Sequence, residues 1–157
     1  MYTVLDVINK LIEIESLASD FYSDISDRGD DFSSFKVLAK VLAKEESKHV
    51  HFYENLKEEL RDEKDIEIDF QTYDKISKIM SEFKNSFREI EKTSIGELLE
   101  FALNFEKDNL ALLLTIRGKL VKTKEDVEKE RYKALSFIVE EEYKHIRDIE
   151  NLINYRK

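Results

Sequence analysis

Four long stretches of this chain carry apolar residues at intervals of three and four positions, the spacing of one face of an α-helix. They span about residues 3–27, 32–62, 94–118 and 123–153. The chain contains no proline and only three glycines, so it lacks the residues that form the tight turns of a many-stranded sandwich or barrel. At 157 residues it is long enough for one core, and the sequence predicts a single all-α domain over residues 1–157.

The connections between the four predicted helices differ in length. Short polar segments join the first helix to the second and the third to the fourth, where Thr123 with Asp126 has the spacing of a capping box. A longer segment separates the second helix from the third. We therefore expect two antiparallel helical hairpins that pack together as a four-helix bundle.

The long connection has two parts. Residues 61–69 are mostly charged, and residues 70–90 again carry apolar side chains at helical spacing. This pattern predicts a partly helical crossover. Its apolar side either covers the bundle or forms part of a dimer interface.

The two predicted hairpins share a sequence pattern. The motif EExKHxxxxENL begins at Glu45 and is repeated at Glu141, 96 residues later. Duplication of one hairpin is the natural explanation of such a repeat. We therefore expect the second and fourth helices to present equivalent residues to the interior.

One glutamate of each predicted helix lies within the apolar stripe. Neighbours three, four and seven positions away are mostly apolar for four residues: Glu15, Glu46, Glu106 and Glu142. A buried, unpaired carboxylate costs several kcal/mol, so such positions need a compensating positive charge. His49 and His145 each follow a glutamate of this set by three residues and share its inward face.

This set of residues is that of a dinuclear metal centre. One glutamate from each of two helices and Glu-x-x-His from each of the other two can hold two divalent cations in a helix bundle. The chain has no cysteine, so thiolate sites within it are excluded. Either Glu46 with Glu142 or Glu15 with Glu106 could bridge the ions. A small rotation of the second and fourth helices would instead bring the adjacent Glu45 and Glu141 inward.

Two further polar residues, Tyr22 and His51, lie on the same predicted helices as these ligands. Tyr22 lies two turns beyond Glu15 on the same face. It is either a core tyrosine or a phenol that bonds a ligand carboxylate or takes part in redox chemistry. His51 lies among polar neighbours and is expected at the surface.

At these residues the chain resembles the rubrerythrin-like branch of the ferritin-like superfamily, over essentially its whole length. The resemblance rests on Glu15 seven residues before Tyr22, on the two Glu-x-x-His motifs and on Glu106. It implies an antiparallel ferritin-like bundle, a non-haem di-iron centre and a homodimer. It also implies reduction of peroxide or oxygen, or oxidation of ferrous iron, as the activity.

The chain departs from rubrerythrins at two points. It has no cysteine-rich rubredoxin domain, so electrons would come from a separate donor protein. A further glutamate of rubrerythrins, three residues after the ligand in the third helix, is replaced by Asn109. An amide supplies no negative charge, which weakens the expectation of peroxidase chemistry relative to that of metal binding.

We therefore predict a di-iron oxidoreductase that reduces peroxide or oxygen. The alternatives are a module that binds or oxidises ferrous iron and a bundle with a structural manganese or zinc site. The formal net charge of −9 has the wrong sign for binding nucleic acid. No apolar run is long enough to span a membrane, and a cytoplasmic location is expected.

Overall fold

The computed structural model describes residues 2–28, 33–61, 67–87, 94–119 and 130–156. Five helices form nearly all of the described chain: α1 (Val4–Ser26), α2 (Ser33–Glu59), α3 (Phe70–Phe87), α4 (Ile95–Lys119) and α5 (Glu130–Arg156). Two strands of two residues each, β1 (Tyr2–Thr3) and β2 (Glu67–Ile68), complete it. The predicted all-α class is confirmed for the described residues.

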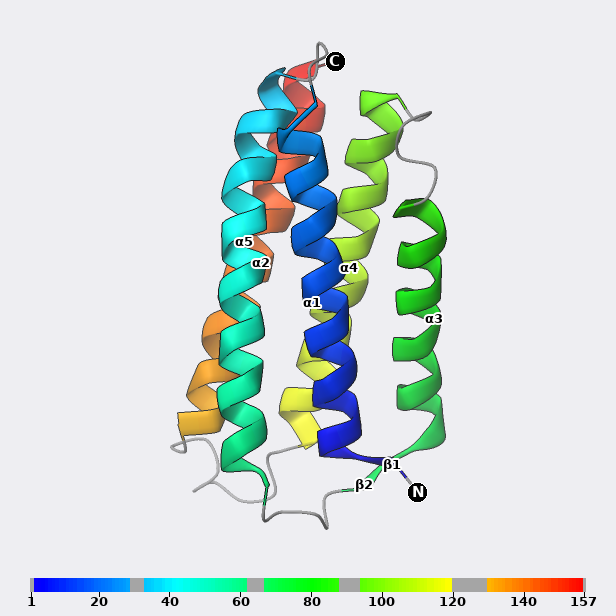
Figure 1. Ribbon diagram of the computed structural model, residues 1–157, viewed down its shortest axis with the longest axis vertical. Coiled ribbons are helices and arrows are strands. Elements are labelled where there is room, and N and C mark those ends of the chain that lie inside the picture. Colours follow the sequence, from blue (N-terminus) through cyan, green and yellow to red (C-terminus); the bar gives the residue numbers. More distant parts are fainter. Residues whose placement is uncertain (1, 29–32, 62–66, 88–93, 120–129, 157) are drawn as a thin grey trace.

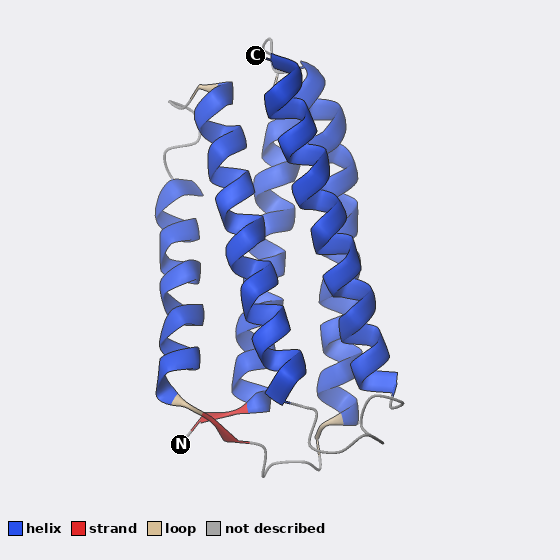
Figure 2. Cartoon of the chain, turned by 180° about the vertical axis from the view of Figure 1, so that it is seen from behind, coloured by secondary structure: helices blue, strands red, loops and turns tan. Residues whose placement is uncertain are grey.

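Four of the helices lie side by side with their long axes roughly aligned (Figure 1). Helix α2 runs back along α1, α5 runs back along α4, and α2 also packs against α5. The view from behind shows the same arrangement, with α3 on the outer side (Figure 2). Side chains from α1, α2, α4 and α5 can therefore meet in one interior.

The start of α1 is fixed by a capping box. The backbone amide of Asp6 donates to Thr3 Oγ1 over 3.4 Å, and Thr3 N donates to Asp6 Oδ2 over 2.8 Å. At the start of α4, Glu97 N donates to Ser94 Oγ over 3.3 Å. The cap predicted at Thr123 and Asp126 lies outside the described residues.

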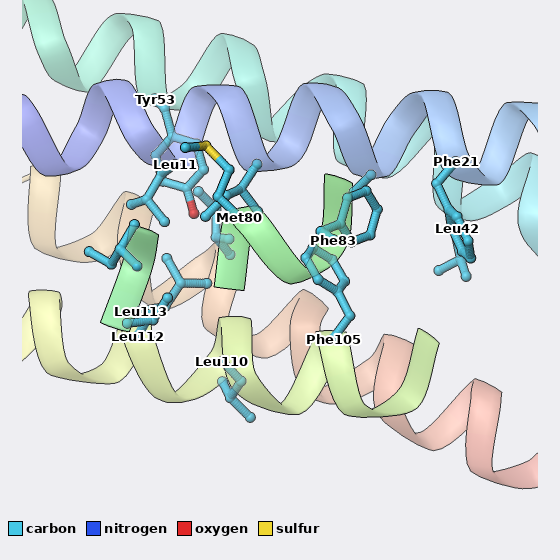
Figure 3. Close-up of a cluster of buried hydrophobic side chains, with 14 of the residues drawn as sticks. Leu11, Phe21, Leu42, Tyr53, Met80, Phe83, Phe105, Leu110, Leu112 and Leu113 are labelled. Atoms are coloured by element: carbon cyan, nitrogen blue, oxygen red, sulfur yellow. The ribbon is translucent and has the colours of Figure 1, made fainter. Parts of the chain in front are cut away.

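The crossover forms α3, which packs on α1 and α4. The ring centroid of its buried Phe83 lies 5.4 Å from that of Phe21 on α1 and 4.5 Å from that of Phe105 on α4. Figure 3 shows Phe83 beside Phe105 within the apolar cluster. Of the two roles expected for this segment, these contacts support covering the packed helices.

A short ribbon that the sequence did not predict joins the N-terminus to the start of α3. Strands β1 and β2 are antiparallel, with Tyr2 opposite Ile68. The Tyr2 ring stacks on Tyr73 of α3 with 3.7 Å between ring centroids. Strands of two residues are too short to show an alternating pattern in the sequence.

The interior is a continuous apolar cluster to which all five helices contribute. Buried polar residues are few among the described positions, and most of them belong to the site described below. Among the described helices, none is both long enough and apolar enough to cross a lipid bilayer.

Candidate metal centre

Each of the helices α1, α2, α4 and α5 places one glutamate in the interior. These are the four residues expected from the apolar stripes, and each side chain is fully buried: Glu15, Glu46, Glu106 and Glu142. The local helical pattern explains their burial because each lies one turn or two from apolar residues of the same face. The structure brings them together from four separate helices.

His49 is fully buried and its Nδ1 faces three of these carboxylates. That nitrogen lies 3.2 Å from Glu142 Oε1 and 3.6 Å from Glu46 Oε2. It lies 3.7 Å from Glu15 Oε2. The Glu-x-x-His spacing on α2 therefore places glutamate and histidine on one inward face, as predicted.

His145 has the matching position on α5. Its Nδ1 lies 3.0 Å from Glu46 Oε1, and 3.7 Å from both Glu106 Oε2 and Glu142 Oε2. The centroids of the two imidazole rings are 5.9 Å apart. The repeated motif is thus expressed as two equivalent halves of one cluster.

The cluster contains two groups of four possible ligands. In each group, one ligand atom per residue can be chosen so that all lie within 4.8 Å of one another. The first group is Glu15, Glu46, His49 and Glu142; the second is Glu46, Glu106, Glu142 and His145. Glu46 and Glu142 belong to both groups. The geometry therefore favours this pair as the shared carboxylates, a choice that the sequence left open.

The outward nitrogens of the two histidines face glutamates of the other hairpin. His49 Nε2 lies 3.4 Å from Glu141 Oε2, and His145 Nε2 contacts Glu45 Oε2. Both glutamate side chains are 19% exposed. Glu45 and Glu141 therefore do not replace their neighbours in the two inner groups, although with His145 they form a third, outer group. Helical periodicity gives no sign of their pairing with the histidines, because these contacts join different helices.

Two polar residues hold the glutamates that belong to only one group. Tyr22 Oη donates a hydrogen bond of 2.7 Å to Glu106 Oε1. Asn109 Nδ2 donates one of 3.0 Å to Glu15 Oε1. Of the two readings of Tyr22, the bond to a candidate ligand carboxylate is the one that the contact supports. Asn109, noted in the sequence only as a missing charge, is a partner of Glu15.

The carboxylates and imidazoles shift one another's proton affinities. Burial alone would lower the pKa of His49, but the carboxylates of Glu141, Glu142 and Glu46 raise it far above its usual value. The pKa of His145 is also raised, because the effect of the carboxylates outweighs that of burial. These carboxylates are Glu106, Glu142, Glu45 and Glu46. Positive charge inside the cluster is therefore strongly favoured.

The pKa values of two of the glutamates, Glu142 and Glu106, shift in opposite directions. Burial, together with the charges of Glu106 and Glu46, raises the pKa of Glu142 well above its usual value. Burial also raises the pKa of Glu106, but the neighbouring Glu142 and His145 and the hydrogen bond from Tyr22 outweigh it and lower the pKa to about 2. Two carboxylates that are buried close together repel each other when both are ionised. A proton or a cation between them removes this repulsion.

The hydrogen bonding of the cluster fits bound cations. Among the described residues, eleven buried side-chain atoms have no hydrogen bond, and nine of them belong to the six candidate ligands. Such atoms are costly to bury unless another partner satisfies them. Carboxylate oxygens and imidazole nitrogens at these separations are suitable ligands for two divalent cations.

Not every histidine belongs to the site. His51 is exposed, as predicted, and its Nδ1 lies 3.6 Å from Glu54 Oε2 at the surface. The other two buried atoms without a hydrogen bond are Tyr53 Oη and Asn109 Oδ1. Tyr53 appears in the sequence only as part of an apolar stripe, and nothing there marks its hydroxyl as unusual.

Comparisons with known proteins identify no relative. No family model matches the chain, and neither a curated protein nor a solved structure is significantly similar to it.

Proposed function

We propose that the chain is a ferritin-like four-helix bundle that holds a dinuclear metal centre. The ligands are the six buried residues of the two inner groups: Glu15, Glu46, His49, Glu106, Glu142 and His145. The observation that carries this proposal is that the two groups share Glu46 and Glu142. In carboxylate-bridged dinuclear centres of helix bundles, two cations share one pair of carboxylates.

Iron is the proposed metal. The ligands are oxygen and nitrogen atoms, which accept iron, manganese or zinc. The spacing of the ligands and of Tyr22 resembles that of rubrerythrins, and this resemblance favours iron. Four carboxylates also offset the charge of two divalent cations.

We propose that the protein is an oxidoreductase that reduces peroxide or oxygen. Iron held by these residues would supply reducing electrons and Lewis-acid polarisation of a substrate oxygen. The chain's own residues keep the ligands in place: Tyr22 holds Glu106, Asn109 holds Glu15, and Glu45 and Glu141 orient the histidines. The surrounding apolar side chains restrict access of water. The 157 residues contain no cysteine for a rubredoxin-type iron, and we propose that a separate donor protein supplies the electrons.

A second candidate is a module that binds and oxidises ferrous iron without a dedicated substrate. The amide of Asn109 favours it, since rubrerythrins have a carboxylate at this position for peroxide turnover. Steady consumption of peroxide in the presence of a reductant would separate the two functions. A third candidate is a bundle with a structural manganese or zinc site. In that case metal removal lowers the melting temperature and no redox activity is found.

The decisive experiment is anaerobic loading with ferrous iron, followed by metal analysis and by admission of peroxide or air. We expect about two irons per chain and a new absorption band of oxo-bridged ferric iron. Fewer than one iron per chain, or iron that stays ferrous with both oxidants, would contradict a di-iron redox centre.

A further inference from the structure

A groove of about 290 Å³ lies between α3 and α4 on the surface of the protein. The two helices run side by side, as Figure 1 shows, and both contribute residues to it. Its polar edge includes the exposed carboxylates of Glu82 on α3 and Asp108 on α4. The rest of its lining is mostly aromatic: Phe83, Phe101 and Phe105. The groove therefore combines an aromatic surface with negative charge.

These rings contact one another and a ring of α1. The centroid of Phe83 lies 4.5 Å from that of Phe105 and 5.5 Å from that of Phe101. The centroid of Phe21 on α1 lies 5.4 Å from those of both Phe83 and Phe101. Separations of this size are those of aromatic rings in van der Waals contact. Figure 3 shows the Phe83 ring beside that of Phe105.

The contacts continue to a candidate metal ligand. Phe21 is followed by Tyr22, and their ring centroids are 5.2 Å apart. Tyr22 Oη donates the hydrogen bond of 2.7 Å to Glu106 Oε1, and Phe105 directly precedes Glu106 in the chain. One series of rings, here called the aromatic series, therefore leads from the groove to the carboxylate of Glu106: Phe101, Phe83, Phe21 and Tyr22.

Contacts of this kind let an electron cross the buried layer around the cluster. An electron tunnels through packed atoms and covalent bonds more readily than across empty space, and the rings need not be oxidised for this. The six candidate ligands are fully buried, so a donor protein in solution cannot touch them. The groove is a place at which continuous contacts join the surface to one of them.

The charge at the groove selects the donor. Among the described residues, Glu82 and Asp108 are the charged side chains that line it, and neither has an ion-pair partner there. The whole chain also has a formal net charge of −9. Negative charge beside an apolar surface attracts a partner whose docking face is positively charged, and it speeds their encounter.

We propose that electrons enter the protein at the groove between α3 and α4, from a one-electron carrier protein with a positively charged surface around its redox group. The electron tunnels along the aromatic series, or through Phe105, to Glu106 and the proposed centre. Each carrier gives up one electron and each ferric ion takes up one, so two carriers reduce a pair of ions. This inference rests on the proposed di-iron function and gives its electron donor a docking place and a charge.

A small cationic reductant tests this assignment. Hexaammineruthenium(II) gives up one electron without exchanging its ligands. The whole chain is loaded with iron, oxidised in air and mixed with this probe under nitrogen, and loss of the ferric absorption band gives the rate of reduction. We expect Glu82→Gln combined with Asp108→Asn to lower this rate about tenfold at low ionic strength. Salt at about 1 M should remove the difference, because it screens exposed charges.

Dithionite, an anionic reductant, gives a test of opposite sign. Loss of two negative charges at the groove should make reduction by dithionite faster rather than slower. The matched control is Glu54→Gln combined with Glu58→Gln, which removes two exposed carboxylates of α2 and changes the net charge equally. Both rates in this control should stay close to the wild-type values.

Attraction of a cation to the groove can also be measured without iron. Hexaamminechromium(III) is paramagnetic and redox-inert, and it broadens the NMR signals of groups that it approaches. In the iron-free chain it should broaden the side-chain amide signals of Asn104, which lines the groove. The broadening should be much weaker in the variant with Glu82→Gln and Asp108→Asn, and unchanged in the α2 control.

The possible failures are distinguishable. Equal rates with hexaammineruthenium(II) in the two double variants, with about two irons bound, would overturn the groove as the point of entry and leave the proposed centre intact. Wild-type protein without broadening at Asn104 would also overturn it. A wild-type chain that binds no iron would overturn the proposed centre and this inference together.

Discussion

The hydroxyl of Tyr22 on α1 donates a hydrogen bond of 2.7 Å to Glu106 Oε1 on α4, between fully buried side chains that are 84 positions apart in the sequence. This bond ties the two hairpins together at the cluster. It also contrasts with Tyr53, whose buried hydroxyl has no such partner among the described residues.

Phenylalanine substitutions should therefore act differently at the two tyrosines. Tyr22→Phe leaves the ionised Glu106 without a donor, and we expect it to lower the free energy of unfolding of the metal-free protein by about 1.5–3 kcal/mol. Tyr53→Phe removes an unsatisfied hydroxyl and should leave stability unchanged or raise it by up to about 1 kcal/mol. Urea unfolding with a chelator present measures both. Equal destabilisation by the two changes would contradict the difference in hydrogen bonding.

Loss of a shared carboxylate should disrupt both ion positions. Glu46 belongs to both inner groups, so Glu46→Ala should reduce binding from two ions per chain to one or none. Equilibrium dialysis with ferrous iron under nitrogen measures the stoichiometry. Glu54→Ala is the control, because Glu54 is an exposed glutamate of the same helix. Two ions bound with unchanged affinity in Glu46→Ala would refute the shared role.

The outer glutamates should affect affinity without being ligands of the inner groups. Glu141→Ala removes the carboxylate that faces His49 Nε2 at 3.4 Å, and the orientation of the imidazole is no longer fixed. We expect metal affinity to fall about 10–100-fold, as is usual for residues that orient a metal-bound histidine. Glu140→Ala, a change at the exposed neighbour, should have no effect. Competition with a metal indicator provides the measurement.

The metal-free protein should become less stable as pH rises. The pKa values of His49 and His145 are raised in the folded state, so their contribution to stability is complete below the unfolded value of about 6.5. It decreases above that pH by about 1.4 kcal/mol per pH unit for each histidine. The raised pKa of Glu142 acts in the same direction. Unfolding free energies measured at several pH values from 6 to 8 test the slope.

Single histidine variants separate the contributions to this slope. His145→Gln should make the pH dependence shallower by about 1.4 kcal/mol per pH unit, because one of the two buried imidazoles is gone. His51→Gln should keep the wild-type slope, since that side chain is exposed. A slope that His145→Gln leaves unchanged would show that the buried imidazoles are not the source of the pH dependence.

The inward glutamates could be predicted because the information is local. Glu15 lies among apolar residues at helical spacing, whereas Glu13 lies among polar ones and pairs at the surface with Lys84. A helix of known period then assigns each residue to a side.

Contacts between helices could not be predicted in this way. Glu45 and His145 are 100 positions apart, and their contact depends on how α2 is aligned along α5. Sequence periodicity says which side of a helix a residue occupies but not what lies opposite. The bond of Asn109 to Glu15 and the unpartnered hydroxyl of Tyr53 were missed for the same reason.

Each half of the cluster contains residues from both hairpins, and this determines when the cluster is completed during biosynthesis. When α1 and α2 leave the ribosome they carry Glu15, Glu46 and His49, but the fourth member of that ligand group, Glu142, is on α5. The glutamate that faces His49 Nε2 is also on α5. A nascent chain therefore offers only a partial set of ligands until its last helix has been synthesised and packed. At the proposed metal centre, tight capture of cations would then be a late event of maturation and would mark chains whose two halves have been correctly assembled.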